Sequence, residues 1–468
     1  MACSVLQQSI DKFPGVHFIR PTALAATITN RSRGQPNIHL QLNDTPGRGV
    51  LPGLEAKALC SIGIPFAAAC QHHVVETFGG ARRVYIIVSK SISKTDNFSA
   101  LREALGDRVI GVRYGVRQHV PWPDVLEMAI ELRDLKADLI VTLGAGSLTD
   151  GAKVAAFAVA NGAFTPEQLD KLHIRSRLDV GSLKPCTIPT INIPTSLSGG
   201  EYNPTGGATD LRNNRKTSFK HPSMGAQLVI LDPALTVSTP RAVWLASGMR
   251  SVDHCVEGLC ALYFKPDEQQ GQTDRRVETE RLLVNGLKLL LPNLLITKTR
   301  LGDLEARRKE MLGVIEALRS FESGLQMGAS HGIGHQLGPM GVGHGETSCV
   351  MLPSVLRWNR MHGDAWVEER QRKILDAFWG DETVADALRQ KGLSREETSA
   401  GDVVAAFVDE LGLPTSLKEV GIGKDQFGEL ARNAMTDRNI PTNPVAIDKE
   451  EQLLEILELA SGWENVGH

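Results

Sequence analysis

Short apolar segments alternate with helical segments between residues 81 and 236 of this 468-residue chain. Helical patterns over FSALREALG (98–106) and PDVLEMAIELRDLKA (123–137) lie between apolar segments. Parallel strands need a crossover connection, usually a helix, so this alternation predicts a doubly wound parallel α/β domain. The expected strands lie in RRVYIIVS (82–89), RVIGVRYG (108–115), DLIVTLGAGS (138–147), TIPTINIPTS (187–196) and AQLVILDP (226–233).

The pattern changes after Pro233, where a period of about 3.6 residues takes over and predicts helices almost to the end of the chain. We therefore expect three parts: an irregular N-terminal arm over 1–60, a dinucleotide-binding α/β domain over 61–236, and an all-α domain over 237–468. The predicted helices include PRAVWLASGMRSVDHCVEGLC (240–260), TERLLVNGLKLLLPNLL (279–295), DVVAAFVDELG (402–412) and KEEQLLEILELA (449–460).

Charge and cysteine usage narrow the class of protein. A formal net charge of -3 leaves no basic excess to hold a phosphate backbone, which argues against a nucleic-acid partner. Seven scattered cysteines without CxxC spacing argue against a disulfide framework and favour a reducing compartment. Because the chain shows neither a signal-peptide pattern nor a run of 18 apolar residues, we expect a cytoplasmic protein that does not enter a membrane.

A glycine-rich turn, residues 144–147, joins an expected strand to an expected helix. Gly144 and Gly146 would let the backbone approach a ligand, and the N–H groups at a helix start would suit a pyrophosphate. On the spacing of the glycines, a plain strand-to-helix turn is an equally good interpretation.

Three histidines lie within fourteen residues of a glycine-rich segment: His331, His335 and His344. His331 and His335 share one face of a helix, and a loop could bring His344 back over them. With His254 they make four imidazoles, which favours a site. Hydrogen-bonded core histidines are the alternative.

These motifs resemble the iron-containing (group III) alcohol dehydrogenase family, and within it the maleylacetate reductase-like branch, over residues of about 61 to 460. GAGSLTDGAK (144–153) is similar to the family's GGGSxxDxxK signature, and IPTSLSGGE (193–201) to its PTTxxTGSE segment. DPALTVSTP, SGMRSVDHCVEG and HGIGHQLGPMGVGHG follow in the family's order. The resemblance implies a dehydroquinate synthase-like architecture and a homodimer.

The resemblance also implies a nicotinamide cofactor held by a set of residues in the first domain: Gly144, Gly146, Ser147, Asp150, Thr195 and Ser196. Ala145 replaces the family's middle glycine, which is tolerable if its φ is negative. Asp150 has an alternative role in stabilising the helix start, and Lys153, Glu201 and Glu257 are assigned to structure. Ser89 and Lys90 follow the first strand where an acid would accept from the 2′-hydroxyl of NAD, so NADPH is favoured over NADH.

Family members that bind a divalent ion use one Asp and three His, and the matching residues are Arg250, His254, His331 and His344. A guanidinium cannot ligate a cation and repels one, so Fe²⁺ or Zn²⁺ binding is expected to be lost. If an ion binds, His254, His331 and His344 are its expected ligands. Asp253 lies about 300° from Arg250 and about 100° from His254 on a helical wheel, and is expected to point away from them.

The predicted activity is NAD(P)H-dependent reduction of a carbonyl in a cleft between the two domains, on a keto acid such as maleylacetate or on an aldehyde or ketone. Arg250, with His254, His331 and His344, would polarise the carbonyl, and His335 would donate the proton or contact the substrate. An Arg fork suits a carboxylate, so an anionic small-molecule substrate is expected. Arg250 has an alternative as a buried ion pair with Asp253 or Glu257. The alternative functions are a metal-dependent alcohol dehydrogenase, a non-redox lyase, isomerase or cyclase on the same scaffold, and a non-catalytic binding protein.

Overall fold

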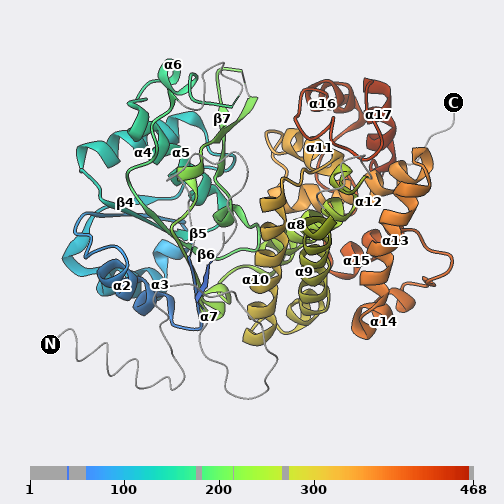
Figure 1. Ribbon diagram of the computed structural model, residues 1–468, viewed down its shortest axis with the longest axis horizontal. Helices are drawn as coiled ribbons and strands as arrows, with labels where there is room; N and C mark the ends of the chain where they lie inside the picture. The colour runs from blue at the N-terminus through green and yellow to red at the C-terminus, as the bar shows by residue number, and fades with distance from the viewer. Residues whose placement is uncertain (1–38, 42–58, 175–181, 214, 266–272, 463–468) are drawn as a thin grey trace. The chain divides into compact units, whose positions relative to one another are not determined.

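The structure is a computed structural model that describes residues 39–41, 59–174, 182–213, 215–265 and 273–462. Contacts between Cα atoms divide the chain into two compact units (Figure 1). Unit 1 comprises residues 1–195 and 200–238, and unit 2 comprises residues 196–199 and 239–468. The predicted boundary between residues 236 and 237 lies two residues before the boundary between the units, at 238 and 239. Ser196, which the prediction places in the first domain, is counted with unit 2.

The described part of unit 1 contains a seven-stranded sheet in the order β1-β2-β9-β6-β5-β3-β4. β1 is antiparallel to β2, and every other neighbouring pair is parallel. The predicted doubly wound parallel sheet is therefore confirmed. The strands are β1 (His39–Gln41), β2 (Leu59–Ile62), β3 (Val84–Val88), β4 (Val109–Tyr114), β5 (Leu139–Gly144), β6 (Thr190–Pro194) and β9 (Leu228–Leu231).

Helices cover both faces of this sheet, and alternate residues of β3 therefore pack in two different cores. Ile86 and Val88 pack in the core that contains α2 (Phe66–Glu76) and α3 (Asp96–Leu105). Tyr85 and Ile87 pack in the core of α4 (Trp122–Asp134) and α5 (Gly146–Asn161). Figure 1 shows these two helix pairs on opposite sides of the strands. Such burial on both faces explains why the strands are apolar throughout. Two short helices, α6 (Pro166–Leu169) and α7 (Pro233–Thr236), complete the regular helices described in unit 1.

Two parts of unit 1 differ from the prediction. β1 and the start of β2 form regular strands within residues 1–60, for which an irregular arm is predicted; the rest of that arm lies outside the described residues. An antiparallel hairpin of β7 (Thr205–Asp210) and β8 (Arg215–Lys220) was not predicted. Their sequences, TGGATD and RKTSFK, contain glycine and charge in place of a clear apolar alternation.

The described part of unit 2 is helical, as predicted. Its long helices α8, α9 and α10 pack side by side (Figure 1), with α9 in contact with both α8 and α10, and α12 packs against α8 and the shorter α11. The helices are α8 (Arg241–Cys260), α9 (Thr273–Thr299), α10 (Leu304–Arg319), α11 (Ala329–Leu337), α12 (His344–His362), α13 (Ala365–Trp379), α14 (Glu382–Gln390), α15 (Ala400–Glu410), α16 (Phe427–Ala434) and α17 (Glu450–Leu459).

The central helix of unit 2 is α8, and every residue from Trp244 to Cys260 is buried. Close packing depends on Gly248, where an added Cβ would lie 2.4 Å from the Leu294 side chain of α9. Because α8 is buried on all sides, its polar residues must find partners inside the unit. This burial places Arg250 and His254 in the interior of unit 2.

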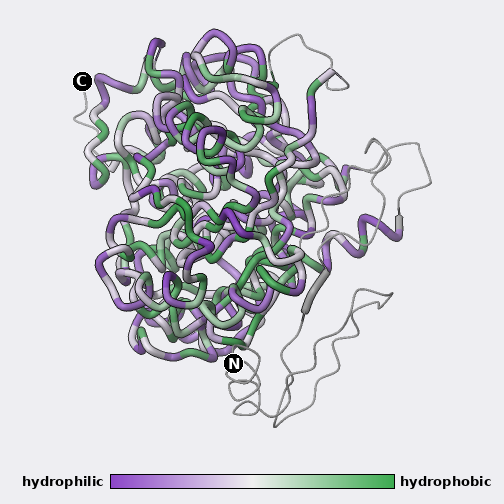
Figure 2. Tube along the Cα trace, turned by 90° about the vertical axis from the view of Figure 1, so that its left-hand side faces the viewer, coloured by the Kyte–Doolittle hydropathy of each residue, from purple (hydrophilic) through white to green (hydrophobic). Residues whose placement is uncertain are grey.

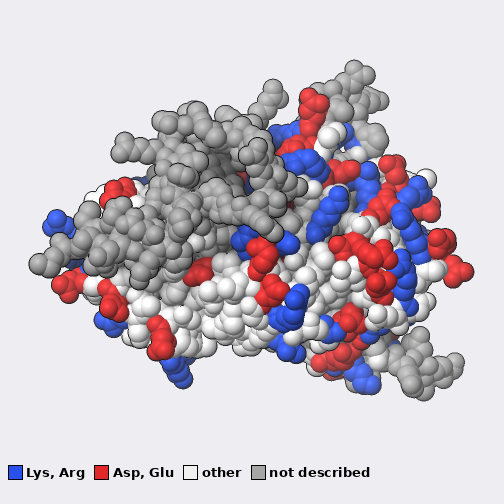
Figure 3. Space-filling view, turned by 90° about the horizontal axis from the view of Figure 1, so that it is seen from below, with Lys and Arg blue, Asp and Glu red and all other residues white. Residues whose placement is uncertain are grey.

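Hydropathy alternates along the described trace (Figure 2), and charges of both signs lie on the described surface (Figure 3). Figure 2 shows hydrophobic and hydrophilic stretches interspersed along the trace. None of the described helices combines the length and apolar character needed to cross a lipid bilayer. On the described part of the face in Figure 3, basic and acidic side chains are mixed, without a single basic patch.

Candidate active site

The carboxyl ends of three neighbouring strands form the candidate cofactor site of unit 1. The chain passes from β3 outward to β4 and then returns to β5 on the other side of β3, so its direction along the sheet reverses between β3 and β5. At that reversal Ser89 N donates to Leu143 O at 3.1 Å, and Thr195 N donates to Gly144 O at 3.1 Å. Ligands of open α/β sheets bind at such a switch point.

The glycine-rich turn joins β5 directly to α5. Gly144 has φ 151°, and a Cβ there would lie 2.5 Å from Leu148 Cδ1 and 3.1 Å from Ser89 Cβ. Ala145 has φ -91°, the negative value that makes its methyl group tolerable. Gly146 and Ser147 begin the helix, so their N–H groups have no carbonyl one turn earlier to bond. The turn therefore fits the pyrophosphate of a dinucleotide.

Asp150 and Lys153 join α5 to the hairpin. Asp150 Oδ2 accepts from Gly207 N at 3.3 Å, and its Oδ1 lies 3.7 Å from Lys153 Nζ. Lys153 is buried and donates to the carbonyls of Gly200 and, at 2.9 Å, Thr205. Lys153 therefore has the structural role assigned to it. A contact of Asp150 with the cofactor stays a prediction.

The remaining predicted cofactor contacts are polar and lie near the switch point or just after β6. Ser89 Oγ lies 3.3 Å from Ser91 Oγ and 3.4 Å from Ile92 N. Glu201, assigned to structure, is buried and accepts from the Thr149 hydroxyl at 3.2 Å. The predicted roles of Ser89, Thr195 and Ser196 in binding the cofactor stay predictions.

In unit 2, Arg250 lies on the buried helix α8 one turn before His254. Arg250 is 2% exposed, and its Nη1 donates to Ser348 Oγ at 3.0 Å. Burial lowers the pKa of Arg250, while nearby carboxylates oppose that shift. Burial, with the charge of Arg250, holds the pKa of His254 well below its usual range. The imidazole is therefore neutral beside a guanidinium.

The predicted orientation of Asp253 was wrong. Asp253 Oδ2 lies 3.7 Å from Arg250 Nη1 and 3.4 Å from His331 Nδ1. It also accepts from the hydroxyls of Ser330, at 3.0 Å, and Ser348, at 2.6 Å. Three residues along a helix turn about 300°, which leaves only about 60° between side chains that are neighbours on one face. The alternative of a buried ion pair between Arg250 and Asp253 is therefore present.

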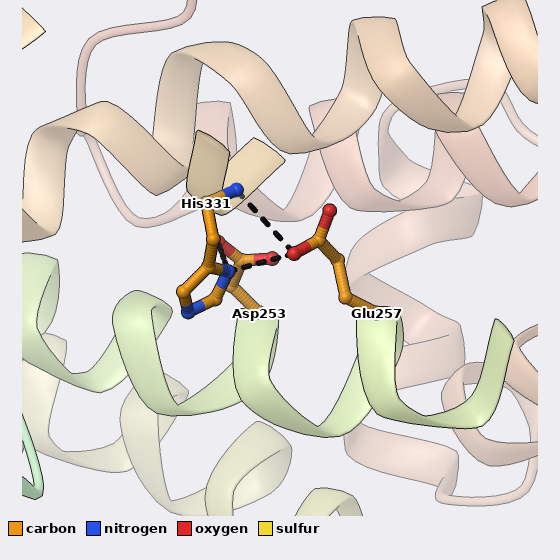
Figure 4. Close-up of side chains that lie close together, drawn as sticks. All are labelled: Asp253, Glu257 and His331. Atoms are coloured by element: carbon orange, nitrogen blue, oxygen red, sulfur yellow. Dashed lines mark hydrogen bonds and ion pairs between the residues drawn. The ribbon is translucent and has the colours of Figure 1, made fainter. Parts of the chain in front are cut away.

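Glu257 joins α8 to the start of α11, as its assignment to structure predicts. Its carboxylate accepts from Ser330 N at 2.7 Å and Gly328 N at 3.1 Å. It also accepts from His331 Nδ1 at 2.7 Å (Figure 4). Burial and Asp253 raise the pKa of Glu257, and the backbone N–H donors oppose this. The N–H groups of Gly328, Ser330 and His331 all donate to this carboxyl group, which favours its ionised form. Glu257 thus caps α11 and orients the ring of His331.

The hydrogen bond to Glu257 fixes the tautomer of His331. A carboxylate only accepts, so His331 carries its proton on Nδ1. Burial, followed by Arg250 and the neighbouring histidines, holds the pKa of His331 well below its usual range, so the ring is neutral. Its Nε2 is buried and has no hydrogen-bond partner within the described part of the chain. The ring of His254 lies 4.9 Å away, measured between centroids.

His335 and His344 lie at the edge of this cluster. His335 is partly exposed, with its ring centroid 6.5 Å from that of His331 and its Nδ1 3.0 Å from Asp437 Oδ2. His344 is exposed and begins α12. The structure therefore brings Arg250 and the histidines of α8 and α11 together, with His344 on the rim.

Two carboxylates of this cluster were not part of the favoured prediction, although the ion pair of Asp253 with Arg250 was kept as an alternative. Asp437 follows α16 in a segment without helical periodicity, about a hundred residues beyond its partner His335, so only the fold reveals the pair. Asp253 could have been found from its i,i+3 spacing to Arg250.

The cluster does not fit a divalent ion of the expected kind. Arg250 occupies the position where the resemblance implies a carboxylate ligand, and its guanidinium is buried beside both imidazoles. Asp253, Glu257 and His331 offer atoms within 4.8 Å of one another. However, Glu257 is already bonded to the Nδ1 of His331 and to backbone N–H groups, so this group is better described as a positioning network.

A dinucleotide-type sheet combined with a buried cluster of imidazoles is typical of an oxidoreductase, and comparison with known proteins supports this class. The sequence model for iron-containing alcohol dehydrogenase matches residues 66–233, and the model for the Fe-containing alcohol dehydrogenase family, C-terminal, matches residues 245–461. The chain belongs to the iron-containing alcohol dehydrogenase family. It is thus an NAD(P)-dependent oxidoreductase that acts on alcohol or carbonyl groups.

Several relatives cover most of the chain. "Dehydrogenase ALT3" of Alternaria alternata is 45% identical over 386 residues, which are 81% of this chain and 99% of the relative. "Dehydrogenase FUM7" of Gibberella moniliformis is 41% identical over 418 residues, 87% of this chain and 96% of the relative. "Maleylacetate reductase 1" of Cupriavidus pinatubonensis is 25% identical over 382 residues, 80% of this chain and 88% of the relative.

A solved structure shares the fold at low identity. Sulfoacetaldehyde reductase from Bifidobacterium kashiwanohense, in complex with NAD+, is 20% identical with a TM-score of 0.68, and the match covers 86% of this chain and 96% of that one. This likeness supports the α/β sheet with a helical domain after it.

Proposed function

We propose that this chain reduces a carbonyl compound with NAD(P)H and does so without a divalent ion. The observation that supports the proposal is the guanidinium of Arg250, which is buried on α8 at the position of the implied carboxylate ligand. Burial holds the pKa of both His254 and His331 low, and the charge of Arg250 lowers both further. A fixed cation supplies the electrostatic stabilisation that a metal ion supplies elsewhere.

The residues of each unit have separate tasks in this proposal. Gly144, Gly146, Ser147 and Thr195 hold the dinucleotide, which supplies the hydride when it is bound. Arg250 stabilises the negative charge that develops on the carbonyl oxygen, a contribution of about 10²- to 10³-fold in kcat for one such donor. His335 delivers the proton to that oxygen.

The substrate class depends on how much of the charge of Arg250 is available. Asp253 lies 3.7 Å from Nη1 and neutralises part of it. An anionic substrate, such as a keto acid, is retained as the proposal because the guanidinium fork matches a carboxylate. Assays with maleylacetate and with a neutral ketone of similar size, each with NADPH and with NADH, distinguish the substrate and cofactor choices. The absence of a carboxylate after β3 favours NADPH.

A second candidate is a metal-dependent alcohol dehydrogenase, which one observation favours. His331 presents a buried Nε2 with no hydrogen-bond partner in the described part of the chain, and a neutral imidazole nitrogen is a metal ligand. A carboxylate that accepts from the other ring nitrogen, as Glu257 does from His331 Nδ1, commonly accompanies a metal-ligating histidine.

Metal analysis of Arg250→Asp tests the proposal against this candidate. The wild type should contain no stoichiometric iron or zinc when it is purified without chelators, and EDTA should leave its NAD(P)H oxidation unchanged. Arg250→Asp should gain up to one equivalent of metal because it restores a carboxylate beside neutral imidazoles. Arg250→Ala is the matched control, since it removes the cation without adding a ligand.

One equivalent of metal in the wild type, together with loss of activity in EDTA, would support the metal-dependent enzyme instead. Turnover of a substrate without net NAD(P)H consumption would support the non-redox alternative. We also propose a cytoplasmic homodimer, for which light scattering after gel filtration measures the mass in solution.

A further inference from the structure

His335 has a carboxylate partner that no motif of the chain identifies. Asp437 Oδ2 lies 3.0 Å from His335 Nδ1, and the Asp437 side chain is 12% exposed. The carboxylate accepts, so the imidazole carries a proton on Nδ1. Burial raises the pKa of Asp437, but the hydrogen bond from His335 and its charge lower it more, which keeps the carboxylate ionised at neutral pH.

A tight turn fixes the second oxygen of the same carboxylate. Asp437 Oδ1 accepts from Asn439 N at 2.9 Å, and Asp437 N donates to Ala434 O at 2.7 Å. This arrangement is an Asx turn, in which the side chain bonds the backbone two residues later. Oδ1 of Asp437 is thus bonded within the turn, and Oδ2 faces the imidazole of His335.

The segment 437–443 is anchored on α11, which carries His335. Asn443 Oδ1 accepts from Ala329 N at 3.2 Å, and Thr442 Oγ1 donates to Met327 O at 2.5 Å. Gly332 permits this close approach, because a Cβ there would lie 2.7 Å from Ile440 Cδ1. The carboxylate of Asp437 is therefore held on a rigid support at a fixed place beside α11.

We infer that Asp437 is a positioning residue that holds His335 in its Nδ1–H tautomer and fixes the orientation of the ring during carbonyl reduction. This inference rests on the proposed role of His335 as proton donor. Asp437 acts through the imidazole and does not touch the reacting atoms. Proton donation therefore starts from the imidazolium, in which Nδ1–H stays bonded to the Asp437 carboxylate. Nε2–H gives its proton to the substrate oxygen, and the ring returns to the neutral Nδ1–H tautomer.

Asp437→Asn gives a specific test, because the Asx turn dictates how the amide lies. The turn needs an acceptor for Asn439 N, so the amide oxygen takes that place and the amide NH₂ faces His335. An NH₂ group donates, which forces Nδ1 to become the acceptor and moves the ring proton to Nε2. Long-range ¹H–¹⁵N spectra of ¹⁵N-histidine-labelled full-length protein report this tautomer, with His335→Gln used for assignment.

We expect the Nδ1–H tautomer in the wild type and the Nε2–H tautomer in Asp437→Asn. The variant should lose roughly 10²-fold in kcat, the usual size of a general acid–base contribution, because an amide NH₂ facing Nδ1 disfavours the imidazolium that donates the proton. Substrate KM and NADPH affinity should change little. Asp437→Ser is a second variant, since its hydroxyl still bonds Asn439 N without reaching the imidazole, and it should show a mixture of tautomers. The exposed Asp448→Asn is the matched control and should match the wild type.

The inference would be overturned by an Nε2–H tautomer in the wild type, or by a tautomer and kcat that do not change in Asp437→Asn. A uniform fall in thermal stability and NADPH affinity, with the tautomer kept, would show a merely structural role and would also overturn it. If the tautomer changes as expected but the wild type reduces no carbonyl, the proposed function fails while the positioning of His335 by Asp437 holds.

Discussion

At the scale of single residues, Gly144 carries the strictest local requirement of the cofactor site. Its φ of 151° is a region that side chains rarely adopt, and a Cβ there would meet both Leu148 and Ser89. Gly144→Ala should lower the free energy of unfolding by about 1 to 3 kcal/mol and weaken NADPH binding. Urea denaturation and fluorescence titration measure the two effects.

Ala145→Gly is the matched control for that substitution. Ala145 already has φ -91° and precedes the first turn of α5, so a glycine there meets no steric requirement and should change stability by less than about 1 kcal/mol. Equal losses in the two variants would contradict the steric explanation.

Features that depend on the local backbone could be predicted from the sequence, whereas contacts between side chains of distant residues could not. The turn after β5 and the pair Arg250 and His254 follow from local spacing. The carboxylates around that pair do not, because Asp253 was placed on the wrong face and Asp437 lies on a distant segment. Arg250 therefore belongs to a balanced buried network and not to an isolated positive site.

At the scale of elements, the strands and helices with strong periodicity were predictable and the weakly patterned ones were not. α8 begins at Arg241, directly after Pro240, and ends at Cys260, close to the predicted 240–260. The β7–β8 hairpin escaped because strand residues such as Gly206 and Gly207 pack against α5 and its Asp150, a tertiary contact that leaves no apolar alternation.

Three helices of unit 2 meet at one buried carboxyl group. Glu310 of α10 accepts from Trp244 Nε1 of α8 at 2.8 Å and from Thr297 Oγ1 of α9 at 2.6 Å. Burial raises the pKa of Glu310 to about 7 from an ordinary value of 4.5. Between these pH values the folded state binds more protons than the unfolded state, so this group's contribution to stability falls as pH rises from about 4.5 to 7.

Glu310→Gln should remove that pH dependence. The amide oxygen still accepts from Trp244, and its NH₂ can donate to the Thr297 hydroxyl, so the helix contacts persist. The stability of the variant relative to wild type should rise by about 2 kcal/mol between pH 5 and pH 8, measured by urea denaturation. The exposed Glu396→Gln should show no such trend, and a constant difference for Glu310→Gln would refute the explanation.

At the scale of the whole molecule, the chain contains two units, and the hydrophobic cores of one unit are separate from those of the other. Two cores cover the faces of the unit 1 sheet, and another lies among α11, α12, α16 and α17 of unit 2. The change of periodicity after Pro233 allowed this division to be predicted from sequence. How the units cooperate could not be derived from periodicity, because it depends on contacts between residues distant in the chain, and the predicted cleft between them stays a prediction.

Cofactor binding and carbonyl activation should be separable, because the strand ends and the α5 turn belong to unit 1 while Arg250 belongs to unit 2. NADPH should slow amide hydrogen exchange at residues 89–92 and 144–149, where backbone N–H groups would contact it. Arg250→Ala should keep this protection and lose about 10²-fold or more in kcat. Loss of the protection in a folded Arg250→Ala protein would instead make Arg250 part of the cofactor site. The fall in activity of this variant would then reflect weaker NADPH binding.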